Sequence, residues 1–263
     1  MFPVLLDIGP VHIYAYGVAI MTGTWLAWLY ARRAMAPFGA DAETVSKMIV
    51  WGFIAAFVGG KVFYFLQAPA YFAAHPDEAL ALSGSGFVFY GSFLFAVPTF
   101  YWFVRTHGLP VPAMFDIVTV CTGLIHGCGK IGCLLAGCCY GSPSAPGWWT
   151  ITFDHPGIPA HPLHEPLYAT QVYDAILIFG SLALVLWIKR RGWLTGRLFL
   201  VYAMLYSAGR FFTEHYRGDV ERGFVLGGLL SHSQAIAIGV ILACAAIWWW
   251  STRRAPQPRT RAA

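Results

Sequence analysis

The sequence has few charged residues for its length. Only 11% of its 263 residues are Asp, Glu, Lys or Arg, whereas a soluble domain carries roughly a quarter. Hydrophobic residues make up 58% of the chain. Most of its surface must face a medium other than water, and a lipid bilayer fits. The composition argues against the one or two soluble domains that the length alone suggests.

Lysine and arginine are absent from three stretches, which are Met1–Pro10, Gln67–Ser85 and Gly141–Pro166. The first absence argues against a cleavable signal peptide, since such a peptide needs a positively charged region before its apolar core. We therefore expect the first apolar segment to be a retained helix. The chain also lacks a basic stripe with interleaved aromatic residues, so no nucleic-acid partner is expected.

Seven apolar segments are long enough to cross a bilayer, which takes about 20 residues. They are roughly Ile13–Tyr30, Met48–Leu66, Gly86–Val104, Ala113–Leu135, Leu167–Ile188, Arg197–Phe212 and Leu229–Trp250. We expect an all-α membrane protein of about seven transmembrane helices. Residues 1–252 would form the transmembrane domain, with an outer loop at about 141–166. Residues 253–263 would form a short basic cytoplasmic tail.

Basic residues follow the first, third, fifth and seventh segments, and they predict the orientation. They are Arg32, Arg33, Arg105, Lys189, Arg190, Arg191, Arg253, Arg254, Arg259 and Arg261. Cytoplasmic loops carry an excess of Lys and Arg, so these residues would lie in the cytoplasm and the N-terminus outside. The expected location is the bacterial plasma (inner) membrane, with multiple passes.

Five cations do not lie at the predicted cytoplasmic face, and the position of each needs an explanation from its surroundings. They are Lys61, Lys130, Arg210, Arg217 and Arg222. An ionisable group within a span costs about 3 kcal/mol and marks a polar cavity or a partner.

Arg210, Glu214 and Arg217 have spacing i, i+4, i+7, so they share one face if the helix continues. A guanidinium suits phosphate oxygens. We expect Lys130 and one of these arginines to hold an anionic lipid phosphate. The alternative is an internal salt-bridge network of the three residues.

The most unusual segment runs from Gly127 to Gly141 and contains Cys128, Cys133, Cys138 and Cys139. These cysteines have three interpretations: small packing residues, a disulfide of Cys133 with Cys138 or Cys139 on an oxidising outer face, or a reactive or metal-binding thiol. Their spacing does not match common zinc or haem patterns. We therefore predict no metal and no cofactor.

Histidines offer weaker candidates. His155, His161 and His164 in the outer loop are expected to be solvated, with metal binding together with Asp154 and Glu165 as an alternative. His126 lies beside the cysteine segment and is a candidate base.

Motifs along nearly the whole chain, taken in order, resemble the bacterial prolipoprotein diacylglyceryl transferase family. They are Tyr14-Ala-Tyr-Gly17, Gly59-Gly-Lys61, Phe89-Tyr-Gly91, the glycine frame of Gly129–Gly141, Thr170-Gln-Val-Tyr-Asp-Ala175, Gly209–Arg217 and Ser233-Gln234. The resemblance implies transfer of diacylglycerol from phosphatidylglycerol to the lipobox cysteine thiol of a prelipoprotein. A thioether forms and glycerol phosphate is released.

The resemblance also implies roles for single residues. Arg210 and Arg217 would hold the phosphate, and Glu214 would orient them. Lys130 stands where the family has a signature arginine, and Tyr90 where it has a histidine. Cys133 and Cys138 replace a signature Asn and Glu. These departures suggest a divergent, cysteine-rich paralogue.

The predicted site has two parts. The catalytic residues are Tyr90, Lys130, Cys133, Cys138 and Arg210, and the substrate-binding residues are Tyr16, Lys61, Gln171, Tyr173, Glu214 and Arg217. The expected partners are phosphatidylglycerol or another anionic phospholipid, a prelipoprotein lipobox peptide and the membrane.

Two rival functions remain open. One is a thiol-redox or thiol-transfer protein that uses Cys133, Cys138 and Cys139. The other is a non-enzymatic lipid-binding or transport protein, although the sequence shows no inverted repeat of the transporter kind.

Overall fold

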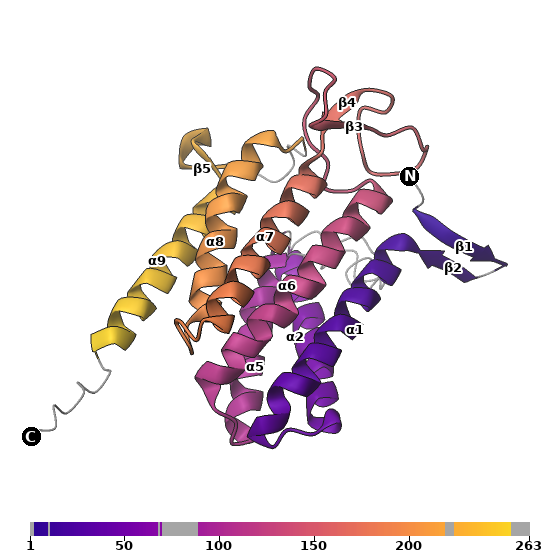
Figure 1. Ribbon diagram of the computed structural model, residues 1–263. Coiled ribbons are helices and arrows are strands. Elements are labelled where there is room, and N and C mark those ends of the chain that lie inside the picture. Colours follow the sequence, from indigo (N-terminus) through magenta and orange to yellow (C-terminus); the bar gives the residue numbers. More distant parts are fainter. Residues whose placement is uncertain (1–2, 10, 68, 70–88, 219–223, 254–263) are drawn as a thin grey trace, which may run out of the picture. The chain divides into compact units, whose positions relative to one another are not determined.

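The computed structural model describes residues 3–9, 11–67, 69, 89–218 and 224–253. Three predicted features lie outside these residues: the outer stretch 70–85, Arg222 and the tail from residue 254. Within the described part the chain is mostly helical and has seven α-helices (Figure 1).

Each helix coincides with one predicted segment. The helices are α1 (Ala15–Met35), α2 (Ala42–Gln67), α5 (Phe89–Thr106), α6 (Val111–Ala136), α7 (Thr170–Arg190), α8 (Leu198–Thr213) and α9 (His232–Arg253). Four of them, α2, α6, α7 and α9, are long and apolar enough to cross a membrane. Helix α2 begins six residues before the predicted start at Met48, because the Asp41 carboxylate accepts a hydrogen bond from the backbone N–H of Thr44 at 2.8 Å and caps the helix.

The all-α prediction missed three short antiparallel hairpins. They pair β1 (Val4–Ile8) with β2 (Val11–Tyr14), β3 (Thr150–Thr152) with β4 (Pro166–Tyr168), and β5 (Phe224–Val225) with β6 (Leu230–Ser231). Strands of two to five residues are too short to give a clear alternating pattern.

The chain divides into two compact units. Unit 1 contains residues 1–27 and 118–263, and unit 2 contains residues 28–117. Helices α1 and α6 each pass from one unit into the other.

In unit 2, helices α2 and α5 touch through two glycines. A Cβ atom added to Gly59 would lie 2.2 Å from the Gly91 carbonyl oxygen, and one added to Gly91 would lie 2.2 Å from the Gly59 oxygen. Small residues at such contacts let two helix backbones approach closely. The contact leaves no room for any side chain larger than hydrogen.

One end of unit 1 holds several helix ends together with the β3–β4 hairpin (Figure 1). These are the end of α6, the start of α7, the end of α8 and the start of α9. The basic residues Lys189, Arg190, Arg191 and Arg197 lie at the opposite end, in the turn between α7 and α8. The Arg197 guanidinium lies 5.2 Å from the ring centroid of Trp248, near the end of α9. This contact places the α7–α8 turn beside the C-terminal end of α9.

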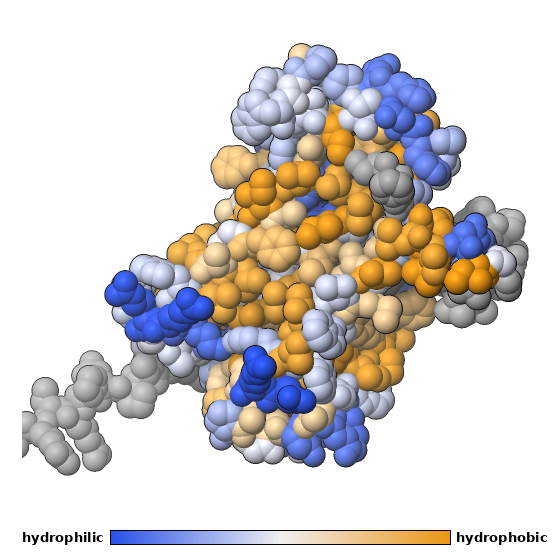
Figure 2. Space-filling model, turned by 45° about the vertical axis from the view of Figure 1, so that its right-hand side comes forward, coloured by the Kyte–Doolittle hydropathy of each residue, from blue (hydrophilic) through white to orange (hydrophobic). Residues whose placement is uncertain are grey.

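The helical surface is strongly apolar. Large side chains such as Met21 (73% exposed), Ile176 (66%) and Leu242 (64%) point outward. Figure 2 shows one face on which hydrophobic side chains cover much of the helical surface and hydrophilic ones gather beyond helix ends. Exposed apolar surface of this extent fits contact with lipid rather than water.

We predict that Gly59→Ala and Gly91→Ala each destabilise the protein by about 1 to 3 kcal/mol, because each added methyl overpacks a backbone contact. Gly52→Ala in α2 is the matched control, since a Cβ there meets nothing within 4 Å. Thermal unfolding in detergent checks this: the midpoint should fall for Gly59→Ala and Gly91→Ala and stay level or rise for Gly52→Ala. Equal midpoints for all three variants would contradict the close approach.

Candidate functional site

A buried ion pair joins α6 to α7 in unit 1. The Lys130 ammonium lies 2.7 Å from Oδ2 of Asp174, whose side chain is fully buried while that of Lys130 is 12% exposed. Asp174 follows Tyr173 in a helix whose middle part is mainly apolar. Because an isolated carboxylate is costly in such a setting, the pairing with Lys130 is what makes Asp174 tolerable there.

Thr213 extends this pair to a second one on α8. Its hydroxyl donates to Asp174 Oδ1 at 3.0 Å and accepts a hydrogen bond from Arg210 Nη1 at 3.2 Å. Arg210 in turn forms a salt bridge through Nη2 with Glu214 Oε2. Lys130 and Arg210, 80 positions apart in the sequence, therefore belong to one polar network.

The start of α9 is tied to the same network. The Ser231 hydroxyl donates to Glu214 Oε1 at 2.9 Å. The Gln234 amide donates from Nε2 to the Phe211 carbonyl at 3.3 Å and accepts the Ser231 N–H at Oε1 at 3.0 Å. Four elements of unit 1, namely α6, α7, the C-terminal end of α8 and the start of α9, thus share one hydrogen-bonded site.

The prediction that Arg217 shares a helical face with Arg210 and Glu214 is wrong. Helix α8 ends at Thr213, a single 3₁₀ turn covers Glu214–Tyr216, and Arg217 is extended with φ −76° and ψ 140°. Its Nη1 donates to the Cys139 carbonyl at 2.8 Å, so it binds the loop that follows α6. Of the predicted salt-bridge network, the Arg210–Glu214 pair is present.

The charges of the site do not cancel. The site has three cations (Lys130, Arg210 and Arg217) and two carboxylates (Asp174 and Glu214), which leaves an excess of one positive charge when the cysteines are neutral. The Coulomb energy of such an excess is larger in an apolar medium than in water.

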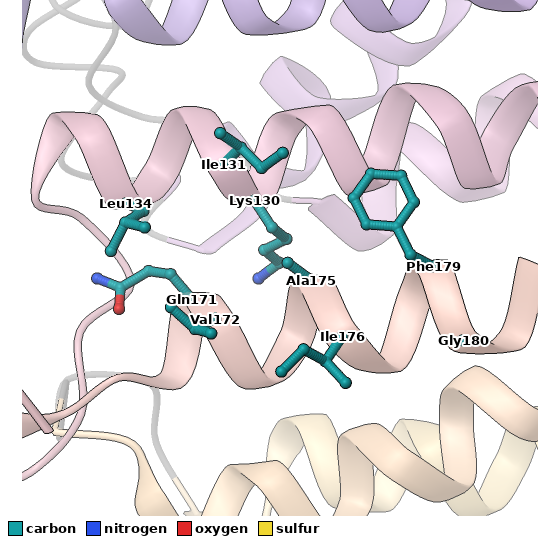
Figure 3. Close-up of a pocket in the computed structure, with 9 residues that line it drawn as sticks. All are labelled: Lys130, Ile131, Leu134, Gln171, Val172, Ala175, Ile176, Phe179 and Gly180. Atoms are coloured by element: carbon teal, nitrogen blue, oxygen red, sulfur yellow. The ribbon is translucent and has the colours of Figure 1, made fainter. Parts of the chain in front are cut away.

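A cavity of about 490 Å³ opens between α6 and α7. Its lining is mainly apolar (Ile131, Leu134, Val172, Ala175, Ile176, Phe179 and Gly180), with Lys130 and Gln171 as the polar groups. Figure 3 shows Lys130 extending from α6 toward α7, with Gln171 on α7 nearby. A cation at the wall of an apolar cavity suits an amphiphile with an anionic head.

Gln171 has one satisfied and one unsatisfied polar atom. Its Nε2 donates to the Cys138 carbonyl at 2.8 Å. Its Oε1 is buried and has no hydrogen-bond partner among the described residues. A buried acceptor without a donor is costly, so a ligand hydroxyl at the cavity would satisfy it.

The other predicted site residues lie in unit 2 or make packing and hydrogen-bond contacts within unit 1. The Tyr173 hydroxyl donates to the Trp149 carbonyl and fixes the outer loop. Tyr16 packs on α6, where a Cβ on Gly132 would lie 3.1 Å from the Tyr16 Cα. Lys61 belongs to unit 2, with its ammonium 5.8 Å from the ring centroid of Tyr64. Tyr90 is the second residue of α5 in unit 2, and its side chain lies outside the described part of the structure.

The three cysteines around the end of α6 are free thiols in the structure. Their sulfur atoms lie within 4.8 Å of one another. Hydrogen bonds from the Cys133 and Cys138 thiols lower the pKa of Cys139, and the charges of Lys130 and Arg217 act in the same direction. The positive charges of Lys130 and Arg217 therefore favour a thiolate within this cluster.

The histidine alternatives gain no support. His164 lies 3.2 Å from Asp154 on the exposed loop. Over the described ranges, the three cysteines are the one group of potential metal ligands close enough to share an ion. His126 packs its ring 4.9 Å from that of Tyr206.

Sequence reasoning left Asp174, Thr213 and Ser231 out of the predicted site. Asp174 carried a usable signal, since a carboxylate within an apolar helix requires a counter-ion. Thr213 and Ser231 carried none, because isolated hydroxyl residues are common at helix ends.

Comparison with known proteins identifies the family. The family model described as prolipoprotein diacylglyceryl transferase matches residues 3–250. The chain belongs to the prolipoprotein diacylglyceryl transferase family. The predicted family is thus confirmed, and with it an enzyme of lipoprotein biosynthesis, a membrane-bound transferase.

Curated relatives agree over nearly the whole length. A phosphatidylglycerol–prolipoprotein diacylglyceryl transferase of Clostridium tetani is 33% identical over 242 residues, which are 92% of this chain and 94% of the relative. One of Nitrobacter winogradskyi is 33% identical over 244 residues, covering 86% and 80% of the two chains. One of Clostridium perfringens is 31% identical over 239 residues and covers 91% of each. The suggestion of a divergent paralogue stays a prediction.

We predict that Asp174→Ala destabilises this family member by about 3 to 5 kcal/mol, because it leaves the Lys130 ammonium buried and unpaired. The double variant Lys130→Met, Asp174→Leu should recover most of that loss, since no charge remains. Glu43→Gln is the control, since it removes the exposed Glu43–Lys47 pair and should leave the unfolding midpoint unchanged. If Asp174→Ala unfolds at the wild-type midpoint, Asp174 is not a buried counter-ion.

Proposed function

We propose that the site in unit 1 transfers a diacylglyceryl group from phosphatidylglycerol to the cysteine thiol of a prelipoprotein. Membership of the family supports this reaction. The observation that carries the placement of the site is the single network in which Lys130, at an apolar cavity, connects through Asp174 and Thr213 to Arg210.

The donor lipid would bind by its phosphate and its chains together. The phosphate would approach Lys130, the polar group of the cavity that carries a positive charge. The apolar lining from Ile176 and Phe179 would contact the acyl chains. The unsatisfied Gln171 Oε1 would accept a hydrogen bond from a glycerol hydroxyl of the headgroup. Phosphatidylglycerol offers these three features, namely an anionic phosphate, hydroxyls and two acyl chains.

The chemistry requires one bond to form and one to break. The acceptor thiolate attacks the carbon of the diacylglyceryl group that bears the phosphate, and a carbon–sulfur bond forms. The bond between that carbon and the phosphate oxygen breaks, and its electron pair stays on the phosphate oxygen. Glycerol phosphate departs with that added charge. Lys130 and Arg210 would stabilise the charge as it develops, and Asp174 and Glu214 would hold the two cations in position.

Acceptor activation needs a group that removes the thiol proton. The candidates for this role are Tyr90, at the position of the family's histidine, His126 and the cysteines. Lys61, Tyr16, Tyr173 and Arg217 are proposed to bind substrate or to shape the site. Arg217 would do so through the Cys139 carbonyl that it already contacts.

We further propose seven membrane spans with the N-terminus outside and the C-terminus in the cytoplasm of an inner membrane. In unit 1 the basic residues of the α7–α8 turn lie at one helix end and the polar network near the other, and basic ends stay cytoplasmic. The site would then face the outer leaflet. The spans form one transmembrane domain, residues 1–252, followed by the basic tail 253–263.

We predict that Arg210→Ala strongly reduces transfer while the protein still inserts, and that Lys130→Arg retains transfer whereas Lys130→Gln loses most of it. Loss of a charged hydrogen bond to phosphate is worth about 1.5 to 3 kcal/mol, or roughly 10- to 150-fold in kcat/KM for the lipid. Lys47→Gln is the control, because Lys47 is an exposed cation that pairs with Glu43 on the same helix.

The assay incubates purified protein with labelled phosphatidylglycerol and a lipobox peptide and measures thioether and glycerol phosphate. Wild-type turnover by Arg210→Ala would refute the proposed site. Bound lipid without product in the wild type would favour the transport alternative. Loss of activity in a Cys138→Ser, Cys139→Ser double variant would favour the thiol alternative.

A further inference from the structure

The end of α6 brings the first two of three cysteines together. Gly137 has φ 69°, its N–H bonds to the Leu134 carbonyl at 3.3 Å, and the Cys138 N–H bonds to the Cys133 carbonyl at 3.1 Å. This pair of bonds defines a Schellman motif, in which the residue after the glycine contacts the residue five positions before it. Here those two residues are Cys138 and Cys133. The helix ending itself therefore sets one thiol against the other.

An unusual backbone conformation adds the third thiol. Cys139 has φ 60°, which is left-handed and rare for a residue with a side chain. Without it, the side chains of consecutive residues 138 and 139 would diverge. Such a conformation is energetically unfavourable for a residue with a side chain and persists only where its surroundings enforce it.

Three donors enforce this conformation. The Thr170 hydroxyl and Arg217 Nη1 each donate to the Cys139 carbonyl at 2.8 Å, and Gln171 Nε2 donates to the Cys138 carbonyl at 2.8 Å. Both carbonyls of the turn are thus fixed by side chains from α7 and from residue 217. The thiol cluster is held in place by groups outside its own segment.

The dimensions of the cluster suit a metal with thiolate ligands. Bonds of about 2.3 Å from one ion to three sulfurs place the sulfurs roughly 4 Å apart. The three sulfurs already lie within 4.8 Å of one another, and Cys133 is buried. Nearby positive charge from Lys130 and Arg217 offsets the negative charge of three thiolates.

We propose that Cys133, Cys138 and Cys139 form a three-thiolate site for one thiophilic d¹⁰ cation of the Zn²⁺ or Cd²⁺ class, with a fourth coordination position open. Binding replaces three thiol protons, which are released to solvent, by three metal–sulfur bonds. The proposal goes beyond the transfer function proposed above and does not rest on it. It departs from the absence of a metal predicted from the sequence, because spacing along the chain could not reveal the left-handed turn.

The test uses the full chain in lipid nanodiscs, reduced and freed of metal, titrated with Cd²⁺. The expected result is one bound cadmium per chain by elemental analysis, with ultraviolet sulfur-to-cadmium absorption that saturates at the same point. Cys139→Ala and Cys138→Ala should each weaken binding at least about 100-fold, as expected when a ligand is removed. Cys128→Ala, in the same helix, and Cys244→Ala are matched controls and should bind as the wild type does.

Folding is checked separately, by elution and thermal unfolding of the metal-free variants. Cadmium should also raise the unfolding midpoint of the wild type and leave that of Cys139→Ala unchanged. Three results would overturn the proposal: no stoichiometric cadmium, equal binding by Cys139→Ala and Cys128→Ala, or a Cys133–Cys138 or Cys133–Cys139 disulfide in the purified protein that blocks binding. Transferase activity in a Cys138→Ser, Cys139→Ser variant bears only on the function proposed above.

Discussion

A carboxylate buried in an apolar helix is stable only beside a positive charge, and Asp174 imposes that condition on unit 1. Its side chain is fully buried and lies 2.7 Å from Lys130. Through Thr213 it also reaches Arg210 on α8. Separating these helices would expose unpaired charges to an apolar medium at a cost of several kcal/mol. The Lys130–Asp174 pair and the hydrogen bond from Thr213 therefore fix the mutual positions of α6, α7 and α8 near the site.

Side-chain hydrogen bonds hold the segments around this site in place. The loop after α6 is held by Thr170, Gln171 and Arg217 through two carbonyls, and the start of α9 is held through Ser231 and Glu214. Rigid support of this kind reduces the reorganisation needed when charge develops during a reaction. Arg217 contacts this loop instead of lying on the helical face that holds Arg210.

Hydropathy was sufficient to predict the helices, because a span of about 20 apolar residues leaves few alternatives. The resemblance in motif order was sufficient to predict the family. Geometry that depends on single dihedral angles could not be predicted in the same way. The end of α8 at Thr213 broke the i, i+7 relation between Arg210 and Arg217, and the left-handed Cys139 brought three thiols together. Asp174 lay within reach of sequence reasoning, since an intramembrane carboxylate demands a partner, but its link to Arg210 depends on Thr213, which no pattern marked.

The central claim is that Lys130 and Arg210 act on the same bound phosphate although they lie on different helices. A double-mutant cycle measures it directly, with kcat/KM for phosphatidylglycerol determined for Lys130→Gln, Arg210→Gln and the double variant. The account predicts strong non-additivity, with a coupling energy above about 0.5 kcal/mol, as found for residues in one network. Additive losses, the behaviour of distant and independent sites, would contradict it.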